Sequence, residues 1–364
     1  MRVLFLTNIP SPYRVDFFNE LGKYCELTVL YERQKADDRL WIVNNKKNYK
    51  SIFLKGKSIG NDTALSFEVL KHLNKKYDRI IVGGYSTPTG MLSILYLSLR
   101  HIPFYINCDG GYIKEDSKIN YLIKKFFIRK ANYWLSTGKE TTEYLIHYGA
   151  KKEYIYVYPF TSLYKKDILD KPLDKIEKEL LKKELNVIDD KIVIFVGQMI
   201  YRKGIDVLLE AINYVSKDVK FYIVGGKPKQ EYINYINEHQ LTNVFFFDFM
   251  NKELLFKYYQ ISDLFVLPTR EDIWGLVINE AMANGLPIIT TDKCVAGKEL
   301  INDNGYIIES EDYNNLAIKI NELFNDQTLL KQFANISLKI INNYTMENMA
   351  KTVYQILFRM DDKK

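Results

Sequence analysis

The feature that most constrains the fold is a regular alternation of short apolar runs with longer amphipathic stretches. The strand-like runs are RVLFLTN, ELTVLY, RIIVGGY, PFYINCDGG and YWLST in the first half, and KIVIFVGQ, KFYIVGG, NVFFFDF, DLFVLPT and PIITT in the second. Helix-period stretches between them include residues 15–23, 118–131, 204–215, 253–261 and 276–284. Such alternation predicts an α/β protein with nearly all-parallel sheets that helices cover on both faces.

The alternation occurs twice, and the chain of 364 residues is too long for one hydrophobic core, which stops growing at about 250–300 residues. We therefore expect two domains, 1–165 and 166–345, with the charged helix pattern LDKIEKELLKKELNV at the entry of the second. In the segment 346–364, Met346, Met349, Val353, Ile356 or Leu357, and Met360 recur at helical spacing. This segment should form an amphipathic helix that packs back on the first domain.

Charge is distributed unequally between the two predicted domains. Residues 1–165 carry 26 Lys and Arg against 15 Asp and Glu, whereas residues 166–364 carry 25 against 30. The two halves should therefore meet different partners, with an anionic one on the first. Three distant cysteines without a CxxC pair exclude a disulfide framework and a thiolate zinc site, and they fit a cytoplasmic setting.

The richest candidate site follows the run DLFVLPT. Ligands of open α/β sheets bind beyond the carboxyl ends of the strands, and here Asp272 precedes a helix that starts near Gly275. A helix start attracts a diphosphate, and Glu280 could accept hydrogen bonds from a ribose diol. The alternative is that Asp272 is only an N-cap and Glu280 a solvated helix residue.

A second candidate turn follows the run KIVIFVGQ. It contains Arg202 and Lys203 directly before another helix, and two such cations could stabilise a departing diphosphate. The alternative is a solvated basic turn.

These motifs together resemble family 4 of the retaining glycosyltransferases, the "glycosyl transferases group 1", which have the GT-B architecture of two Rossmann-like domains. The block PTREDIWGLVINEAMANGLPIIT resembles the acidic E-x7-E signature of that family, and FVGQMIYRKGIDVLLEA resembles its phosphate-gripping turn. The resemblance extends over the whole chain, through KANYWLSTGKETTEYLIHYGA, IYVYP and FMNKELLFKYYQISDLFVLPT. It implies a GT-B fold and a sugar transferase of bacterial surface-polysaccharide biosynthesis.

The resemblance also implies roles for individual residues of the second domain. Glu280 should bind the ribose, and Asp272 should hold the donor sugar. The N–H groups near the helix start should hold sugar hydroxyls and phosphate; they belong to Ile273, Trp274, Gly275 and Leu276.

Two positions depart from the family pattern. Asp272 replaces the first glutamate of the signature, and Gln198 stands where arginine is usual. The grip on the diphosphate should therefore rely on Arg202 and Lys203.

The first domain should bind the acceptor. Its opening loop contains Pro12 and Arg14, and Arg14 is a candidate contact to phosphate or acceptor, with an ordinary surface arginine as the alternative. Asp109 matches a polar active-site position of the family that is often histidine, and it is a candidate catalytic or acceptor-orienting residue. Its alternative is a turn aspartate before two glycines.

The predicted helix 118–131 is basic and amphipathic. Lys118, Lys125 and Arg129 share one face, and Leu122 and Phe126 are among its apolar residues. The helix can lie on an anionic membrane surface, or it can bury its apolar residues in the fold with its lysines in solvent. No recognised nucleic-acid motif accompanies the charge, so nucleic acid is not an expected partner.

The sequence thus predicts a cytoplasmic, retaining hexosyltransferase, peripheral on the inner face of the plasma membrane. It should move a sugar from a UDP- or GDP-linked donor to a saccharide or lipid-linked saccharide. No cofactor and no metal are expected, because the metal-binding Asp-x-Asp pattern does not occur. Two alternatives remain open: a nucleotide-sugar epimerase or hydrolase of the same fold, and a non-catalytic subunit that binds nucleotide sugar.

Overall fold

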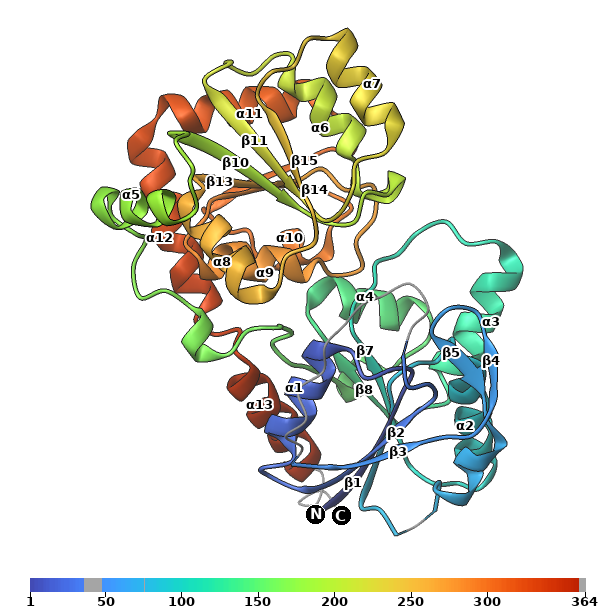
Figure 1. Cartoon of the computed structure of the whole chain (residues 1–364). Coiled ribbons are helices and arrows are strands. Elements are labelled where there is room, and N and C mark those ends of the chain that lie inside the picture. Colours follow the sequence, from blue (N-terminus) through green and yellow to red (C-terminus); the bar gives the residue numbers. More distant parts are fainter. Residues whose placement is uncertain (36–47, 75, 360–364) are drawn as a thin grey trace. The chain divides into compact units, whose positions relative to one another are not determined.

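The computed structural model describes residues 1–35, 48–74 and 76–359 (Figure 1). The chain divides into two compact units, each built on its own sheet. Unit 1 consists of Met1–Ser162 and Thr345–Lys364, and unit 2 of Leu163–Tyr344. The boundaries between the units therefore lie after residues 162 and 344. The sequence predicted them after residues 165 and 345.

Within the described residues of unit 1, the sheet has seven strands, which pair in parallel throughout. Their order is β3 (Lys50–Phe53), β2 (Glu26–Tyr31), β1 (Arg2–Thr7), β6 (Arg79–Val82), β7 (Tyr105–Cys108), β8 (Tyr133–Ser136) and β9 (Ile155–Val157). The five strands predicted for the first half are confirmed. The edge strands β3 and β9 were not predicted; both are short and partly exposed.

Helices cover both faces of this sheet (Figure 1). They are α1 (Pro12–Leu21), α2 (Pro88–Leu99), α3 (Lys118–Ile128), α4 (Lys139–His147) and α13 (Met346–Arg359), with 3-10 turns η1 (Phe67–Lys71) and η2 (Lys152–Tyr154) and a hairpin of β4 (Lys57–Ile59) and β5 (Thr63–Leu65). The prediction that a loop continues to residue 14 was wrong. Proline fits the first position of a helix, so α1 begins at Pro12.

The predicted C-terminal amphipathic helix is present as α13. It buries Met346, Met349, Val353 and Leu357, packs against α1, and its Leu357 carbonyl accepts a hydrogen bond of 2.9 Å from Arg79 Nε. Met360, the last residue of the predicted apolar stripe, lies outside the described residues. Unit 1 is therefore assembled from two segments that are distant in sequence.

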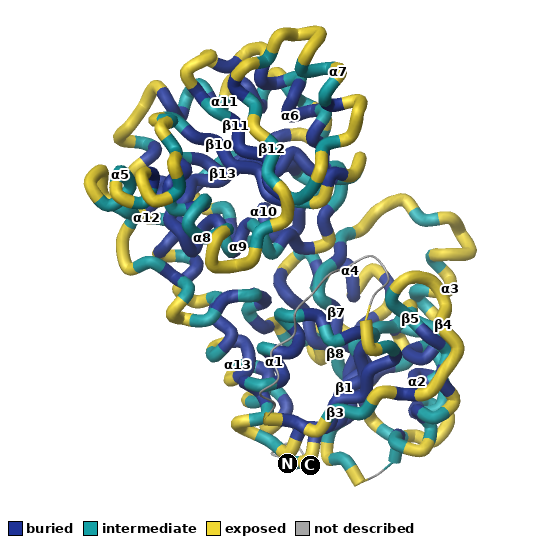
Figure 2. Tube along the Cα trace, in the orientation of Figure 1, coloured by how far each residue is buried: buried dark blue, intermediate teal, exposed yellow. Residues whose placement is uncertain are grey.

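The sheet of unit 2 has six parallel strands, in the order β12 (Val244–Phe247), β11 (Val219–Val224), β10 (Lys191–Val196), β13 (Leu264–Leu267), β14 (Ile288–Thr291) and β15 (Gly305–Ile308). The central strands β10, β13 and β14 are almost fully buried (Figure 2), as their unbroken apolar runs predict. The strand order reverses between β10 and β13, which is the switch point where ligands of such sheets bind.

The helices of unit 2 again lie on both faces, with α6, α7 and α11 on one side in Figure 1. They are α5 (Lys175–Glu184), α6 (Ile205–Ile212), α7 (Gln230–Glu238), α8 (Lys252–Ile261), α9 (Leu276–Ala283), α10 (Val295–Leu300), α11 (Tyr313–Asn325) and α12 (Gln327–Ile341), with 3-10 turns η3 (Lys165–Asp167) and η4 (Tyr201–Lys203). The helices predicted at 204–215, 253–261 and 276–284 are confirmed as α6, α8 and α9.

Candidate active site

Two turns meet at the switch point of unit 2. One follows β10 and ends at Gly204, and the other follows β13. Gly204 has a φ of +69°, and a Cβ there would lie 1.9 Å from the carbonyl oxygen of Pro268. Thr269 Oγ1 and the N–H of Arg270 both donate to the carbonyl of Arg202, at 2.9 and 2.8 Å. The two turns are thus fixed to each other by backbone contact.

The second turn brings a carboxylate to the two predicted cations. Lys203 Nζ lies 2.5 Å from Asp272 Oδ2, and the two residues are only 9% and 7% exposed. Arg202 Nη1 donates to the Glu271 carbonyl at 2.5 Å and lies 3.9 Å from Asp272 Oδ1, while its side chain remains 41% exposed. Lys203 is therefore the buried partner of Asp272, and Arg202 is the cation that an incoming anion can reach.

The backbone of Asp272 is fixed by the loop after β14. Its N–H donates to the carbonyl of Lys293 at 2.9 Å, and its own carbonyl accepts from the N–H of Val295 at 3.1 Å. A parallel bridge to Cys294 results. The alternative that Asp272 is an N-cap is wrong, because Gly275 occupies the cap position of α9.

The start of α9 has the features of an anion site. Its first turn is LVIN, which is uncharged, and the first N–H groups of a helix have no intrahelical acceptor. Gly275 has a φ of +101°, and a Cβ would lie 2.9 Å from Cys294 Sγ. Trp274 is buried and its indole N–H donates to Asn279 Oδ1 at 2.9 Å, whereas the side chain of Ile273 is exposed. The buried indole thus ties the turn before α9 to Asn279 within the helix.

Glu280 lies further along α9, partly exposed, and its side chain neighbours the buried hydroxyl of Tyr259 on α8. Burial raises the pKa of Tyr259 well above its usual value, and the Glu280 carboxylate adds to that shift. Tyr259 therefore stays protonated beside this carboxylate. Gln198, predicted on the donor side, is exposed on the turn after β10.

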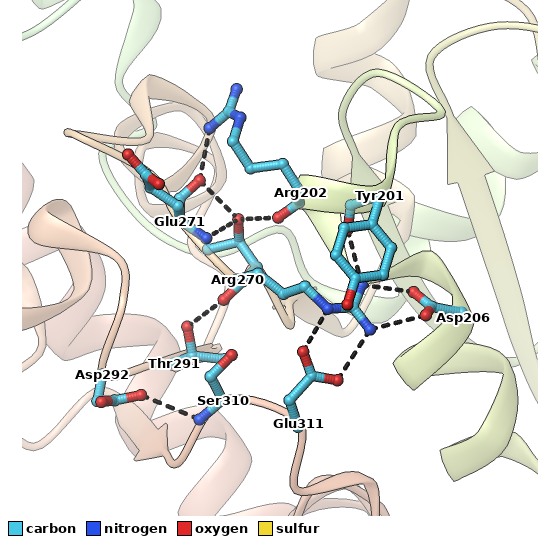
Figure 3. Close-up of polar contacts among 10 residues, drawn as sticks. Tyr201, Arg202, Asp206, Arg270, Glu271, Thr291, Asp292, Ser310 and Glu311 are labelled. Carbon is cyan, nitrogen blue, oxygen red and sulfur yellow. Dashed lines mark hydrogen bonds and ion pairs between the residues drawn. The ribbon is translucent and has the colours of Figure 1, made fainter.

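Arg270 is a further residue of this site, and the sequence reasoning assigned it no role. Its guanidinium donates to Asp206 at 2.8 and 2.7 Å and to Glu311, and it lies 3.8 Å from the ring centroid of Tyr201 (Figure 3). It also donates to the Tyr201 carbonyl at 2.7 Å. Burial opposes ionisation of Asp206, but the hydrogen bonds from Arg270 lower its pKa overall. Arg270 thus joins the turn after β10, the start of α6 and the loop before α11.

One feature of the sequence could have indicated Arg270. It stands three residues after the end of strand β13, at the edge where polar side chains of neighbouring strands meet. Its acidic partners Asp206 and Glu311 are distant in sequence, so the cluster itself is visible only in the fold.

Unit 1 holds a second polar cluster, around Asp109 at the end of β7. Asp109 accepts hydrogen bonds from Arg14 Nη2, from Asn107 Nδ2 at 2.7 Å, and from the hydroxyls of Tyr13 and Tyr158 at 3.2 Å each. Arg14 is 2% exposed, so the alternative of an ordinary surface arginine is wrong. Burial, and next the charge of Asp109, raise the pKa of Tyr13 to about 12.

The predicted residues thus form two groups. Unit 2 brings Arg202, Lys203, Asp272 and Gly275 together, with Glu280 further along the same helix. Unit 1 brings Arg14 and Asp109 together, and Pro12 lies two residues before Arg14 at the start of α1. Arg14 Nη2 contacts Asp109, and the Arg14 side chain is nearly sealed from solvent.

Comparisons with known proteins bear on the sequence of unit 2 and on the fold. Residues 177–339 match the family "Glycosyl transferases group 1", and this match spans most of unit 2. The capsular polysaccharide biosynthesis glycosyltransferase CapM of Staphylococcus aureus is 30% identical over 173 residues, 45% of each chain. The N,N'-diacetylbacillosaminyl-diphospho-undecaprenol alpha-1,3-N-acetylgalactosaminyltransferase of Campylobacter jejuni is 22% identical over 72% of this chain and 71% of its own.

A solved structure extends the likeness to the whole fold. Anabaena HepE in complex with UDP superposes with a TM-score of 0.78 at 17% identity, covering all of both chains. The predicted GT-B fold is thereby confirmed. The alignments with the first curated relatives span only about half the length of those proteins. Across residues 1–35, 48–74 and 76–359, no helix combines the length and apolarity needed to cross a membrane.

Proposed function

We propose that the protein is a retaining glycosyltransferase that moves one hexose unit from a UDP- or GDP-linked sugar to a saccharide or lipid-linked saccharide. The observation that carries this proposal is the cluster of Arg202, Lys203 and Asp272 beside the start of α9, within the group 1 domain.

In this proposal, the donor diphosphate lies against the start of α9. Arg202 is the more exposed cation and contacts the phosphates first. Lys203 forms an ion pair with Asp272, and its ammonium group can also attract the phosphates electrostatically. Positive charge that is fixed in advance lowers the energy of a leaving diphosphate, because little reorganisation is needed as the negative charge develops. Asp272 then accepts hydrogen bonds from hydroxyls of the donor sugar, and Glu280 binds the ribose diol.

The reaction needs no metal in this proposal, since two cations and the starts of α6 and α9 supply the positive charge. Attack of the acceptor hydroxyl on the same face of the sugar as the departing diphosphate retains the anomeric configuration, and the leaving phosphate takes the acceptor proton. Activity should persist in excess EDTA, and NMR of the first-formed product should show the donor's anomeric configuration. Loss of activity in EDTA or an inverted product would reject these two points.

The acceptor side is assigned to unit 1, whose predicted domain carries the excess of basic residues. The Campylobacter jejuni relative is named for a diphospho-undecaprenol-linked acceptor, and CapM for capsular polysaccharide biosynthesis. The first name supports a lipid-linked saccharide as the acceptor, and the second supports a role in making a polysaccharide. In this proposal the protein meets such an acceptor on the cytoplasmic face of the membrane. Asp109, held by four donors, would orient the acceptor hydroxyl.

The proposal is tested by a screen of UDP- and GDP-linked sugars, with nucleotide release measured with and without saccharide acceptors. We expect one donor to be consumed and Arg202→Ala to lower that rate by about a hundredfold, a typical loss for one electrostatic group. Lys217→Ala, on an exposed turn of unit 2, is the matched control. Equal turnover without any acceptor would indicate the hydrolase or epimerase alternative, and nucleotide-sugar binding without turnover would indicate the non-catalytic subunit.

A further inference from the structure

The solvent-facing side of α3 is apolar. Ile119, Leu122, Ile123 and Phe126 are 70%, 54%, 42% and 41% exposed. Their spacing of three, four and seven residues places them on one face of the helix. Figure 2 shows the helix largely in the colours of exposed and intermediate residues. The alternative that this helix buries its apolar residues in the fold is therefore wrong for this stripe.

The opposite side of α3 attaches the helix to unit 1. Ile128 is buried, and its carbonyl accepts a hydrogen bond of 3.0 Å from the indole of Trp134. Lys124 forms an ion pair of 2.8 Å with Asp116 and lies 5.0 Å from the ring centroid of Tyr148. The apolar stripe thus lies on a helix that is anchored to unit 1, and the stripe itself faces solvent.

Basic residues lie along one flank and at one end of the stripe. Lys118, Lys125 and Arg129 lie along one flank of it at helical spacing, and Lys130 lies at its end, 4.4 Å from the ring centroid of Phe126. The sequence contains no Asp or Glu from Lys118 to Lys139. The surface therefore combines four large apolar side chains with a basic flank along the helix.

We propose that this face of α3 docks on an anionic lipid bilayer. The apolar stripe enters the boundary between headgroups and acyl chains, and the flanking lysine and arginine side chains reach the headgroup phosphates. Charge complementarity selects this occupant, because a second copy of the same face would bring like charges together. The proposal rests on the place at the membrane that the proposed function gives the protein, and not on the transfer reaction itself, since it concerns only how unit 1 meets a surface.

Flotation with vesicles tests the proposal. We expect the protein to float with vesicles of phosphatidylcholine and phosphatidylglycerol, not with phosphatidylcholine alone, and to bind less as salt rises. Replacing the three flank residues, Lys118→Gln, Lys125→Gln and Arg129→Gln, should weaken binding on the order of a hundredfold, since each basic residue at the surface contributes about fivefold.

The apolar contribution needs its own variant and control. The pair Leu122→Ser and Phe126→Ser should abolish flotation, whereas Ile176→Ser and Leu180→Ser, which change exposed apolar residues of α5 in unit 2, should leave it intact. Because all four side chains are exposed, both pairs should fold, which circular dichroism checks. Wild-type protein that stays unbound on anionic vesicles, or a stripe variant that binds like wild type, would overturn the proposal.

Self-association is measured in parallel. If sedimentation shows a dimer that the stripe variant loses, the face is an interface between copies and the lipid proposal fails. Donor hydrolysis by the soluble stripe variant should equal that of wild type, so failure of membrane binding and failure of the transferase proposal give different results.

Discussion

Lys203 Nζ lies 2.5 Å from Asp272 Oδ2, with both side chains almost sealed from solvent. Removing one partner of a buried ion pair leaves an uncompensated charge, which costs about 3–5 kcal/mol. Lys203→Met should therefore lower the free energy of unfolding by about that amount, and the double variant Lys203→Met/Asp272→Asn should recover much of it. Unfolding in urea measures the free energy of unfolding of both variants. Neither variant should regain turnover, because both lack the cation.

Equal unfolding free energies of the single and double variants would show that the pair is not coupled. A double variant with restored turnover would show instead that Lys203 acts only on Asp272 and not on phosphate.

Gly204 should tolerate no side chain. Its left-handed φ alone costs a non-glycine residue roughly 1–2 kcal/mol, and the Cβ would also collide with the carbonyl of Pro268. Gly204→Ala should thus destabilise unit 2 clearly more than Gly60→Ala destabilises unit 1, since Gly60 has a similar φ of +67° but open space around it. Thermal unfolding compares the two variants. A loss at Gly204 no larger than that at Gly60 would contradict the close approach.

Arg270→Lys should remove hydrogen bonds that hold the turn of Arg202 and Lys203 in place. A lysine has one point charge and cannot hold Asp206, Glu311 and the Tyr201 carbonyl together. We expect nucleotide affinity to fall about tenfold. Isothermal calorimetry with UDP and GDP measures this effect.

The control for Arg270→Lys is Lys191→Gln, which breaks an exposed ion pair with Asp218 at the opposite end of β10. This variant should bind nucleotide like wild type. Unchanged affinity in Arg270→Lys would remove the positioning role of Arg270.

A substitution of Glu280 tests directly whether its carboxylate binds the ribose of the nucleotide. If its carboxylate holds the diol, Glu280→Gln should bind UDP or GDP about tenfold more weakly and lose the preference for the ribonucleotide over its 2′-deoxy analogue. Tyr259→Phe, which removes the hydroxyl beside Glu280, should show a smaller change in the same direction. A Glu280→Gln variant that still discriminates against the deoxy nucleotide would place the ribose elsewhere.

Glu32 should give unit 1 a distinctive pH dependence. Burial raises the pKa of this carboxyl, although the Thr87 hydroxyl and the Ala64 N–H donate to it and oppose that shift. A raised pKa in the folded state means that the stabilisation by the bound proton is complete below about pH 4.3, the usual value, and is lost as pH rises through the folded pKa. Glu32→Gln should therefore gain stability relative to wild type between pH 4 and pH 8. A difference that does not vary with pH would contradict this expectation.

The central strands could be predicted from the sequence because burial on both faces demands unbroken apolar runs, as in KIVIFV of β10. The edge strand β3 reads KSIF and is partly exposed, so its composition resembles a loop. The positions of Arg202, Lys203 and Asp272 followed from motifs at strand ends. Their pairing did not, because residues 203 and 272 meet only when β10 and β13 become neighbours.

The surroundings of Arg14 show a different limit of sequence reasoning. Polar residues near the start of a helix look solvated in a sequence, and nothing local indicates that Asp109 comes to lie against Arg14. The exposed stripe of α3 shows the reverse, since an apolar face on a helix ordinarily predicts burial. In both cases the outcome depends on which elements pack nearby, which only the assembled unit determines.

The position of α13 bears on how the protein is made. Domains usually fold as they leave the ribosome, yet α1 must wait for its partner helix until all of residues 163–344 have been synthesised. During that interval, the surface of α1 that later packs against α13 stays open to solvent or chaperones. Unit 2 can therefore complete its folding before unit 1 does, although unit 1 begins first in the sequence.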